Sequence, residues 1–294
     1  MSNIIKNYQK VLKTIEPLYQ SIEKLQRPGP KPKMSDIEVV ALSLTAEYMS
    51  IDSENALFER LKHCNIDHLI ERSQFNKRRR KLFMLTEEIR KKLSEKFLEY
   101  EGYFIIDSMP LEICKFSRHH RLKICKEDFL TSPEKGYCAS QNMWFYGYKL
   151  HGTCSVSGVF HSLEITKANV HDIVYLPEVK KQLSDCVLLG DKGYLSASQQ
   201  LDLFHSANIR LETPMRQNQK GYKKQAYIFR STRKRIETLF SQLCDQFLIR
   251  RNYAKSFQGF KTRILSKITA LTLVQFINKF VFNRNLNNIK IQIV

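Results

Sequence analysis

Tyr103-Phe104-Ile105-Ile106-Asp107 is an apolar run that ends on a carboxylate, and Val187-Leu188-Leu189-Gly190-Asp191 repeats that pattern further along the chain. Short apolar runs of this kind are typical of buried β-strands. An acid at the carboxyl end of a buried strand does not contribute to hydrophobic packing. We therefore expect each run to be a strand that delivers its acid, Asp107 or Asp191, to one side of a sheet.

A third acid, Glu237, lies on a predicted helix whose buried stripe includes Ile236, Leu239 and Phe240. Three carboxylates supply the hard oxygen ligands that divalent metals prefer. Two metal ions roughly 3.5–4 Å apart are a standard arrangement for in-line attack on a phosphodiester. Each acid also has a non-catalytic interpretation. Asp107 and Asp191 could be ordinary turn residues after strands, and Glu237 could form an ion pair on the surface of its helix.

The charge of the chain points to nucleic acid. The net charge is +19, from 48 Lys and Arg against 29 Asp and Glu, and the 294 residues are 43% hydrophobic, as in a soluble globular protein. Between Arg210 and Arg263 there are 14 basic residues and three acids, one of which is Glu237. Such a surplus favours a partner with dense negative charge, and DNA fits better than a membrane.

Cysteine usage and the apolar segments indicate the cellular setting. The seven cysteines are scattered and never form a CxxC pair, so they predict neither disulfides nor a zinc site and favour a reducing cytoplasm. Residues 1–13 lack the apolar core of a signal peptide. The most apolar stretch, 264–282, is interrupted by Lys267 and Lys279, so we expect a buried or dimer-forming helix rather than a membrane span.

The pattern along the chain predicts an α/β fold with a small all-helical N-terminal domain. Helical spacing over residues 3–25 breaks at the proline-rich segment 27–33, and Ser35 with Glu38 forms a capping box for the next helix. We expect strands at 103–107, 146–155, 159–166, 186–190 and 209–213, and helices at 173–183, 196–207 and 231–247. This order suits a mixed sheet with helices on its faces.

Other polar residues near the acids are candidates for supporting roles. Lys192 follows Asp191 and can reach a phosphate, while His171 and Asp172 follow a predicted strand and can act as accessory groups or as a helix cap. Basic residues also surround the third acid on its helix: Arg230, Arg233, Lys234 and Arg235.

Six segments, taken in order, resemble the DDE transposases of bacterial insertion sequences, most closely the IS982 family, which is related to the IS4 and IS5 groups. They are 104–108 (FIIDS), 135–140 (KGYCAS), 145–151 (FYGYKLH), 169–172 (NVHD), 190–194 (GDKGY) and 233–243 (RKRIETLFSQL). The resemblance spans roughly residues 35–280. This chain has Arg230 and Cys244 where the broader IS4-type signature has a tyrosine and a lysine, so no tyrosine role is carried over.

The resemblance implies a ribonuclease-H-like catalytic domain in which Asp107, Asp191 and Glu237 bind two Mg²⁺ or Mn²⁺ ions. It further implies cleavage at the element's terminal inverted repeats, strand transfer into target DNA, and a position near the DNA ends for Lys192, Tyr194, Arg233 and Lys234. Only 46 residues separate Asp191 from Glu237, so no insertion domain is expected between them.

The helical pattern of the N-terminal region and its base cluster at 77–81 suggest a separate role in DNA recognition. We expect residues 1–100 to recognise the DNA ends, 101–260 to form the catalytic domain and 261–294 to form a C-terminal helix and tail. A homodimer in the bacterial cytoplasm, associated with the nucleoid, would process two ends together. Two alternatives stay open: a structure-selective DNA nuclease of the same fold, and a catalytically idle DNA-binding regulator.

Overall fold

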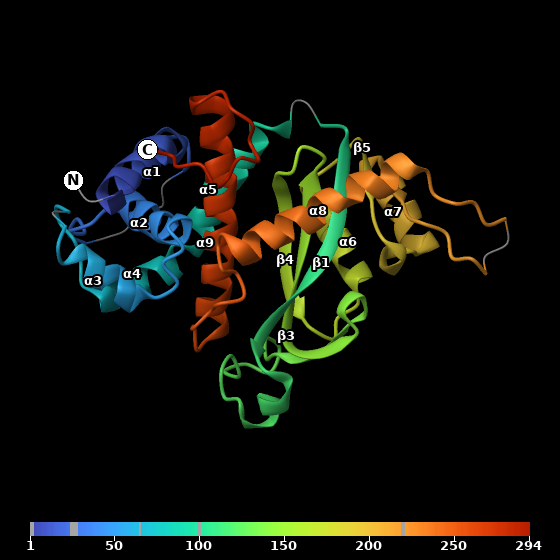
Figure 1. The fold of residues 1–294 in the computed structure, drawn as a ribbon, viewed down its shortest axis with the longest axis horizontal. Helices are drawn as coiled ribbons and strands as arrows, with labels where there is room; N and C mark the ends of the chain where they lie inside the picture. Colours follow the sequence, from blue (N-terminus) through green and yellow to red (C-terminus); the bar gives the residue numbers. More distant parts are fainter. Residues whose placement is uncertain (1–2, 24–28, 65, 99–100, 219–220) are drawn as a thin grey trace. The chain divides into compact units, whose positions relative to one another are not determined.

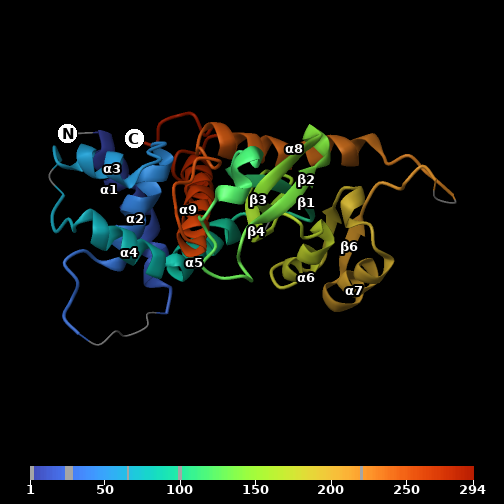
Figure 2. The same ribbon diagram turned by 90° about the horizontal axis from the view of Figure 1, so that it is seen from below.

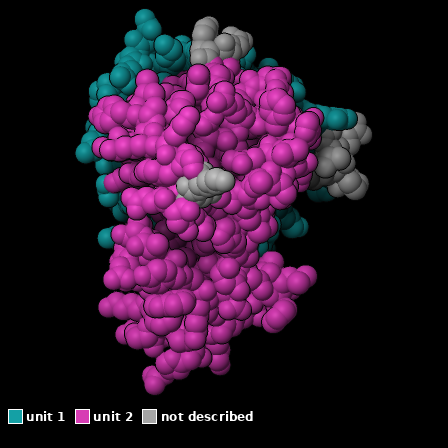
Figure 3. Space-filling model, turned by 90° about the vertical axis from the view of Figure 1, so that its right-hand side faces the viewer, with its two compact units in different colours: residues 1–96, 243–294 teal, residues 97–242 magenta. Residues whose placement is uncertain are grey.

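The computed structural model describes residues 3–23, 29–64, 66–98, 101–218 and 221–294. By packing, the chain forms two compact units, which Figure 3 distinguishes by colour. Unit 1 comprises residues 1–96 and 243–294, and unit 2 comprises residues 97–242. The expected division by function at residues 100 and 260 stays a prediction.

Unit 2 is built on a six-stranded mixed sheet (Figure 1). The strands are β1 (Tyr103–Cys114), β2 (Glu134–Cys138), β3 (Met143–Ser155), β4 (Phe160–Lys167), β5 (Cys186–Leu189) and β6 (Ile209–Glu212). The order is β2-β3-β1-β5-β6, with β4 also paired to β3. Strand β3 runs antiparallel to β1, β2 and β4, whereas β1, β5 and β6 are parallel.

Helices cover both faces of this sheet, as Figures 1 and 2 together show. On one face, α6 (Leu176–Val179) and α7 (Ala197–Ala207) share a buried core with β1, β5 and β6. On the other face lies α8 (Tyr227–Asp245), where the ring of Phe240 stacks on that of Phe160 in β4 at a centroid distance of 5.9 Å. The predicted mixed sheet flanked by helices is therefore confirmed, and it is consistent with a ribonuclease-H-like fold.

The first strand is longer than the sequence pattern predicted. We expected it to end at Asp107, but β1 continues to Cys114 because it stays paired with β3 beyond the point where its register with β5 stops at Ile105. Pro110 is tolerated because that edge of β1 has no strand partner there, so the missing N–H costs no ladder hydrogen bond. Asp107 is thus inside a strand, and the turn interpretation of this segment is wrong.

Smaller differences concern element ends. Strand β2 was not predicted, and the expected helix 173–183 is a 3-10 turn, η4 (Asp172–Tyr175), followed by the short α6. At position 147, glycine is required by close approach, because a Cβ there would lie 2.2 Å from the carbonyl oxygen of Leu111 at the β-bulge of β1.

Unit 1 is helical, as predicted for the first hundred residues. Its helices are α1 (Asn3–Gln20), α2 (Asp36–Tyr48), α3 (Glu54–Leu61), α4 (Arg72–Lys81), α5 (Phe83–Glu95) and α9 (Phe257–Phe276), which continues into the π-helical turn η6 (Ile277–Val281). The capping box is confirmed, since the Ser35 N–H donates to Glu38 Oε2 at 2.6 Å and the Glu38 N–H donates to Ser35 Oγ at 3.3 Å. The predicted break after residue 25 falls partly on positions 24–28, outside the described residues.

Helix α9 is the core of unit 1. The segment Phe257–Val281 is the one helix in the described parts of the chain that is long and apolar enough to cross a membrane, but 78% of its most apolar window is buried. It packs against α2 and α5, which come from the N-terminal part of the sequence. Burial inside the unit, one of the two expected outcomes, is therefore confirmed.

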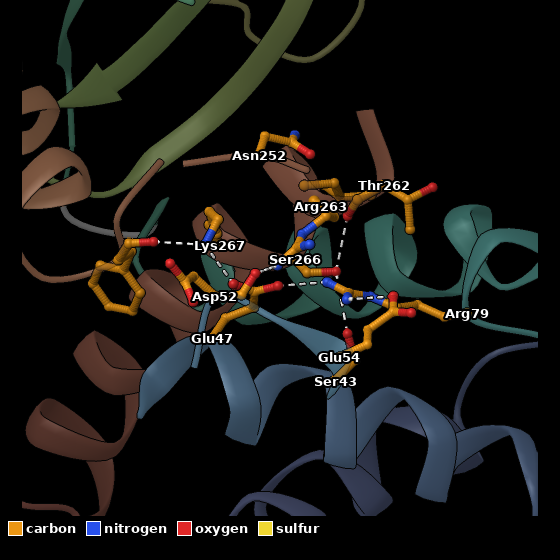
Figure 4. A network of polar contacts seen from close by, with 12 residues as sticks. Ser43, Glu47, Asp52, Glu54, Arg79, Asn252, Thr262, Arg263, Ser266 and Lys267 are labelled. Carbon is orange, nitrogen blue, oxygen red and sulfur yellow. Dashed lines mark hydrogen bonds and ion pairs between the residues drawn. The ribbon is translucent and has the colours of Figure 1, made fainter. Parts of the chain in front are cut away.

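A network of charged side chains is buried beside α9 (Figure 4). Glu47 on α2 is only 1% exposed, and its two carboxylate oxygens accept from Arg79 Nη2 at 2.5 Å and from Lys267 Nζ at 2.6 Å. Lys267 also donates to the carbonyl oxygen of Phe247 at 2.7 Å. The neighbouring cations hold the pKa of Glu47 below its usual value despite the opposing effect of burial. Glu47 thus joins α2, α4 and α9 through ionic contacts.

Replacing this acid tests how far unit 1 depends on the network. Glu47→Gln leaves the buried Lys267 without its counter-charge and Arg79 with only the more distant Glu54, at 3.6 Å, and we expect it to lower the free energy of unfolding by about 3–5 kcal/mol. The measurement is a urea titration at neutral pH. The matched control is Glu59→Gln, since Glu59 pairs with Lys62 at the surface, and there the change is expected to stay within about 1 kcal/mol. Equal changes in the two variants would contradict a structural role for the network.

Candidate active site

The parallel register of β1 and β5 brings two of the predicted acids together. Ile105 pairs with Leu189. Side chains alternate between the two faces along a strand, so residues two positions after a paired residue point to the same face as that residue. Asp107 and Asp191 are each two positions after the paired residues Ile105 and Leu189. Asp107 and Asp191 therefore lie side by side, and each one's charge acts on the other's surroundings.

Asp107 is set in an environment that resists its ionisation. Burial, with the nearby charges of Asp191 and Asp172, raises the pKa of Asp107 to about 7. The backbone N–H of Ser108, which donates to Asp107 Oδ1 at 2.8 Å, and the charge of Arg233 work in the opposite direction. Ionising Asp107 is thus costly, mainly because the carboxyl group is buried.

Asp191 is held by the turn that follows β5. The backbone N–H of Gly193 donates to its Oδ1 at 2.7 Å and fixes the carboxylate at the start of the 3-10 turn η5 (Lys192–Tyr194). A Cβ at position 193 would lie 2.9 Å from Asp191 Oδ1 and 3.6 Å from Asp172 Oδ2. The glycine therefore leaves open the space onto which both carboxylates face.

Asp172 joins this group from η4, with its own cation. Its Oδ1 accepts from Lys149 Nζ at 2.9 Å and from Ser108 Oγ at 3.1 Å. His171 caps η4, its Nδ1 accepting from the Ile173 N–H at 3.3 Å. Of the two accessory candidates, His171 thus has a local structural role, while Asp172 lies beside the acidic pair.

Two supporting residues were missed at the sequence level. Lys149 and His151 occupy alternate positions of β3, so they lie on one face of the strand, which is the signal that would have placed them together. His151 Nδ1 is 3.8 Å from Asp172 Oδ1 and its Nε2 hydrogen-bonds Thr166 Oγ1 at 2.8 Å. Burial lowers the pKa of His151 to about 4, so this ring is neutral at physiological pH.

The predicted nucleic-acid contacts divide into exposed and buried side chains. Lys192, Arg230 and Lys234 are exposed, whereas Arg233 and Arg235 are half-buried. The charge of Arg233 acts on Asp107, and the charge of Arg235 lowers the pKa of Cys154 on β3 against the larger effect of burial. Helix α8 thus turns part of its basic surface toward the sheet.

Tyr194 does not reach the surface. Its side chain is fully buried in the core that α6 and α7 form with the sheet, so direct contact with DNA is not retained for this residue. Burial and the charges of Asp172 and Asp107 raise the pKa of Tyr194 well above its usual value. Its hydroxyl has no hydrogen-bond partner among the described residues.

Glu237 is exposed on α8, four residues after Arg233. Residues four apart share one face of a helix, so Glu237 lies on the side of α8 that presents Arg233 to Asp107. Within the described ranges, however, no three His, Cys, Asp or Glu side chains are gathered closely enough to hold a metal ion. The charges of Asp191 and Asp172 both act on Asp107.

The donor set of the acidic pair nevertheless fits a divalent cation. Asp107 and Asp191 offer carboxylate oxygens, which Mg²⁺ and Mn²⁺ prefer. Burial raises the pKa of Asp107, and repulsion from the charges of Asp191 and Asp172 adds to this effect. A bound cation would relieve that repulsion.

The shifted acid predicts a pH-dependent stability in metal-free protein. The pKa of Asp107 is about 7 in the folded chain against an ordinary value of 3.8, so the folded state binds more protons between these values and stability falls as pH rises through that window. We expect Asp107→Asn to be increasingly more stable than the parent from about pH 4 to pH 7, with a constant advantage above, in thermal melts with EDTA. The same change at the exposed Asp67 is the control, and a pH-independent difference at Asp107 would contradict the shift.

Two substitutions of Tyr194 distinguish a role in core packing from a role in DNA contact. Tyr194→Phe removes a buried hydroxyl that lacks a partner, so stability should be unchanged or slightly higher. Tyr194→Ala should cost about 3–5 kcal/mol by leaving a cavity. Stability is measured by urea titration and DNA binding with a duplex. If Tyr194→Phe is as stable as the parent but binds DNA more weakly, the hydroxyl contacts DNA after all.

A comparison with known protein families agrees with this geometry. The family model described as "Transposase DDE domain" matches residues 101–273, which is more than half of the chain and includes all three predicted acids. Transposases of this kind act on DNA and generally use divalent metal ions. The match shows that the chain belongs to the DDE transposase family, and that its function is DNA transposition.

Proposed function

We propose that this transposase mobilises a bacterial insertion sequence of the IS982 family. In this proposal it cuts the element's terminal inverted repeats in a Mg²⁺- or Mn²⁺-dependent reaction and joins the freed 3′-hydroxyl to target DNA. The observation that carries the proposal is the alignment of Asp107 and Asp191, which lie two residues beyond the paired positions Ile105 and Leu189 of adjacent parallel strands.

Asp107, Asp191 and Glu237 are the proposed metal ligands. Two divalent ions held there would stabilise the entering and leaving oxygens of in-line attack on a phosphodiester. The position of Glu237 on the α8 face that also carries Arg233 supports its assignment as the third acid. Its exposed side chain has the freedom to turn toward the pair when the site is loaded.

Asp172 has a different role in this proposal. Its salt bridge to Lys149 neutralises much of its charge, so it positions rather than binds, holding Ser108 beside Asp107 through the hydroxyl. Lys192, next to Asp191, and the exposed Arg230 and Lys234 on α8 are proposed to contact the phosphates of the bound DNA end.

Assembly and location follow from the reaction. Two element ends must be processed together, so we infer a homodimer that acts on the bacterial nucleoid in the cytoplasm. Recognition of the inverted repeats is assigned to the helical residues of the N-terminal hundred.

The chemistry is tested with a supercoiled plasmid that carries both element ends. Glu237→Gln, Asp107→Asn and Asp191→Asn are each expected to reduce cleavage at the element termini by about two to three orders of magnitude, because each removes a metal ligand. EDTA should abolish cleavage, and Mg²⁺ or Mn²⁺ should restore it. Mapping the nicks to the nucleotide and measuring duplex binding in parallel gives the readout.

Glu178→Gln is the matched control and should leave cleavage unchanged, since it removes a carboxylate of unit 2 that pairs with Lys181 at the surface and is not a proposed ligand. Cuts without joined products from the parent protein would indicate a nuclease instead, and binding without cuts would indicate the idle regulator. Equal cutting by Glu237→Gln and the parent would show that the third acid lies elsewhere.

A further inference from the structure

Unit 1 carries two adjoining hollows, which lie outside the predicted catalytic site and are lined in part by the N-terminal helices. Their volumes are about 680 Å³ and 510 Å³. Both are lined by α4 and by the first turns of α9, and they share Arg80. We call their combined surface the basic groove, because its outer lining carries six cations: Arg72, Lys77, Arg80, Lys81, Lys255 and Lys261.

These six cations have no carboxylate partner within the described parts of the chain. The contrast with their neighbours on the same helix is direct. Arg78 donates to Asp36 Oδ1 at 2.7 Å, and Arg79 donates to Glu47 Oε1 at 2.5 Å. The inward arginines of α4 are thus neutralised, whereas its outward basic side chains are not.

The two acids of the larger hollow do not offset this charge. Glu54 accepts from Asn76 Nδ2 at 2.7 Å and lies 3.6 Å from Arg79, and Asp52 lies 3.8 Å from Arg251. Both acids are therefore engaged with residues other than the six cations. The Nε atoms of the buried Arg79 and Arg263, which also line this hollow, have no hydrogen-bond acceptor among the described residues.

The two sides of the groove are joined to each other. Gln258 Nε2 donates to the carbonyl oxygen of Arg80 at 3.4 Å, and Lys261 Nζ stands 4.8 Å from the ring centroid of Phe83 at the start of α5. The amino end of α9, with its positive helix dipole, opens onto the same groove. The N-terminal and C-terminal parts of the sequence thus form one continuous positive surface.

We propose that the basic groove binds the sugar–phosphate backbone of duplex DNA, as a second contact outside the catalytic unit. The inference rests on the proposed function insofar as DNA is the substrate. Cations without carboxylate partners on two converging helices match a polyanion. Helix α4 is ten residues long, about 15 Å, which is enough to follow several phosphates of one strand.

Three double variants of the full chain, each lacking two positive charges, test the groove. Lys77→Gln/Lys81→Gln removes the α4 side, Lys255→Gln/Lys261→Gln removes the α9 side, and Lys6→Gln/Lys13→Gln on the exposed face of α1 is the matched control. The probe is a fluorescent 30-base-pair duplex of random sequence, whose dissociation constant is measured from 50 to 200 mM NaCl. Unchanged melting temperatures establish that all three variants are folded.

Each groove variant is expected to reduce the slope of log affinity against log salt by about 1.8, which is about 0.9 for each lost phosphate contact, and to weaken binding more than about tenfold. The control should change the slope by less than half as much. If either groove variant matches the control, or if the parent protein does not bind the duplex at 50 mM NaCl, the inference is overturned. Cleavage at the element ends is scored separately, so a protein that binds through the groove but never cuts would refute the proposed chemistry alone.

Discussion

The parallel pairing of β1 with β5 is the constraint on which the rest of unit 2 depends. It sets Asp107 and Asp191 at equivalent positions, and it requires a sheet that is covered on both faces, because parallel strands are stable when buried. The helices α6 and α7 on one side and α8 on the other provide this cover, and Asp107 is half-buried in the covered sheet. The same pairing thus aligns the two acids and places Asp107 in surroundings that raise its pKa.

The surroundings of the acids show a graded compensation of charge. Asp172 has a lysine at hydrogen-bond distance, Asp191 has a backbone N–H, and Asp107 has one N–H and the more distant charge of Arg233. The neighbouring groups thus offset the charge of each acid in a different way, and burial adds to the cost of charging Asp107. A group of carboxylates repels phosphates, so the positive charge on α8 favours the approach of DNA to it.

Local pattern was enough to place both strand acids and the capping box of Ser35, since these depend on residues close in sequence. Local pattern failed where the structure depends on contacts with residues far away in the sequence. The residues Ser108 and Pro110 suggested a turn, but pairing with β3 extends β1 through them. Tyr194 sits in a basic, polar segment, yet it packs against the space left by Gly190, where a Cβ would lie 3.2 Å from its ring. The distance of Glu237 from the aspartates depends on how α8 crosses the sheet, which no local pattern encodes.

Unit 1 is discontinuous in sequence, because α9 packs against helices that the ribosome makes much earlier. Unit 1 therefore cannot complete its core until late in synthesis. Roughly 160 residues separate the end of α5 from the start of α9, which at ribosomal speed is on the order of ten to thirty seconds. Until α9 emerges, α2, which is buried on nearly every side, has no complete core to enter. Unit 2 is continuous and can form first, so a nascent chain would hold its folded sheet while its N-terminal helices wait, exposed to chaperones and proteases.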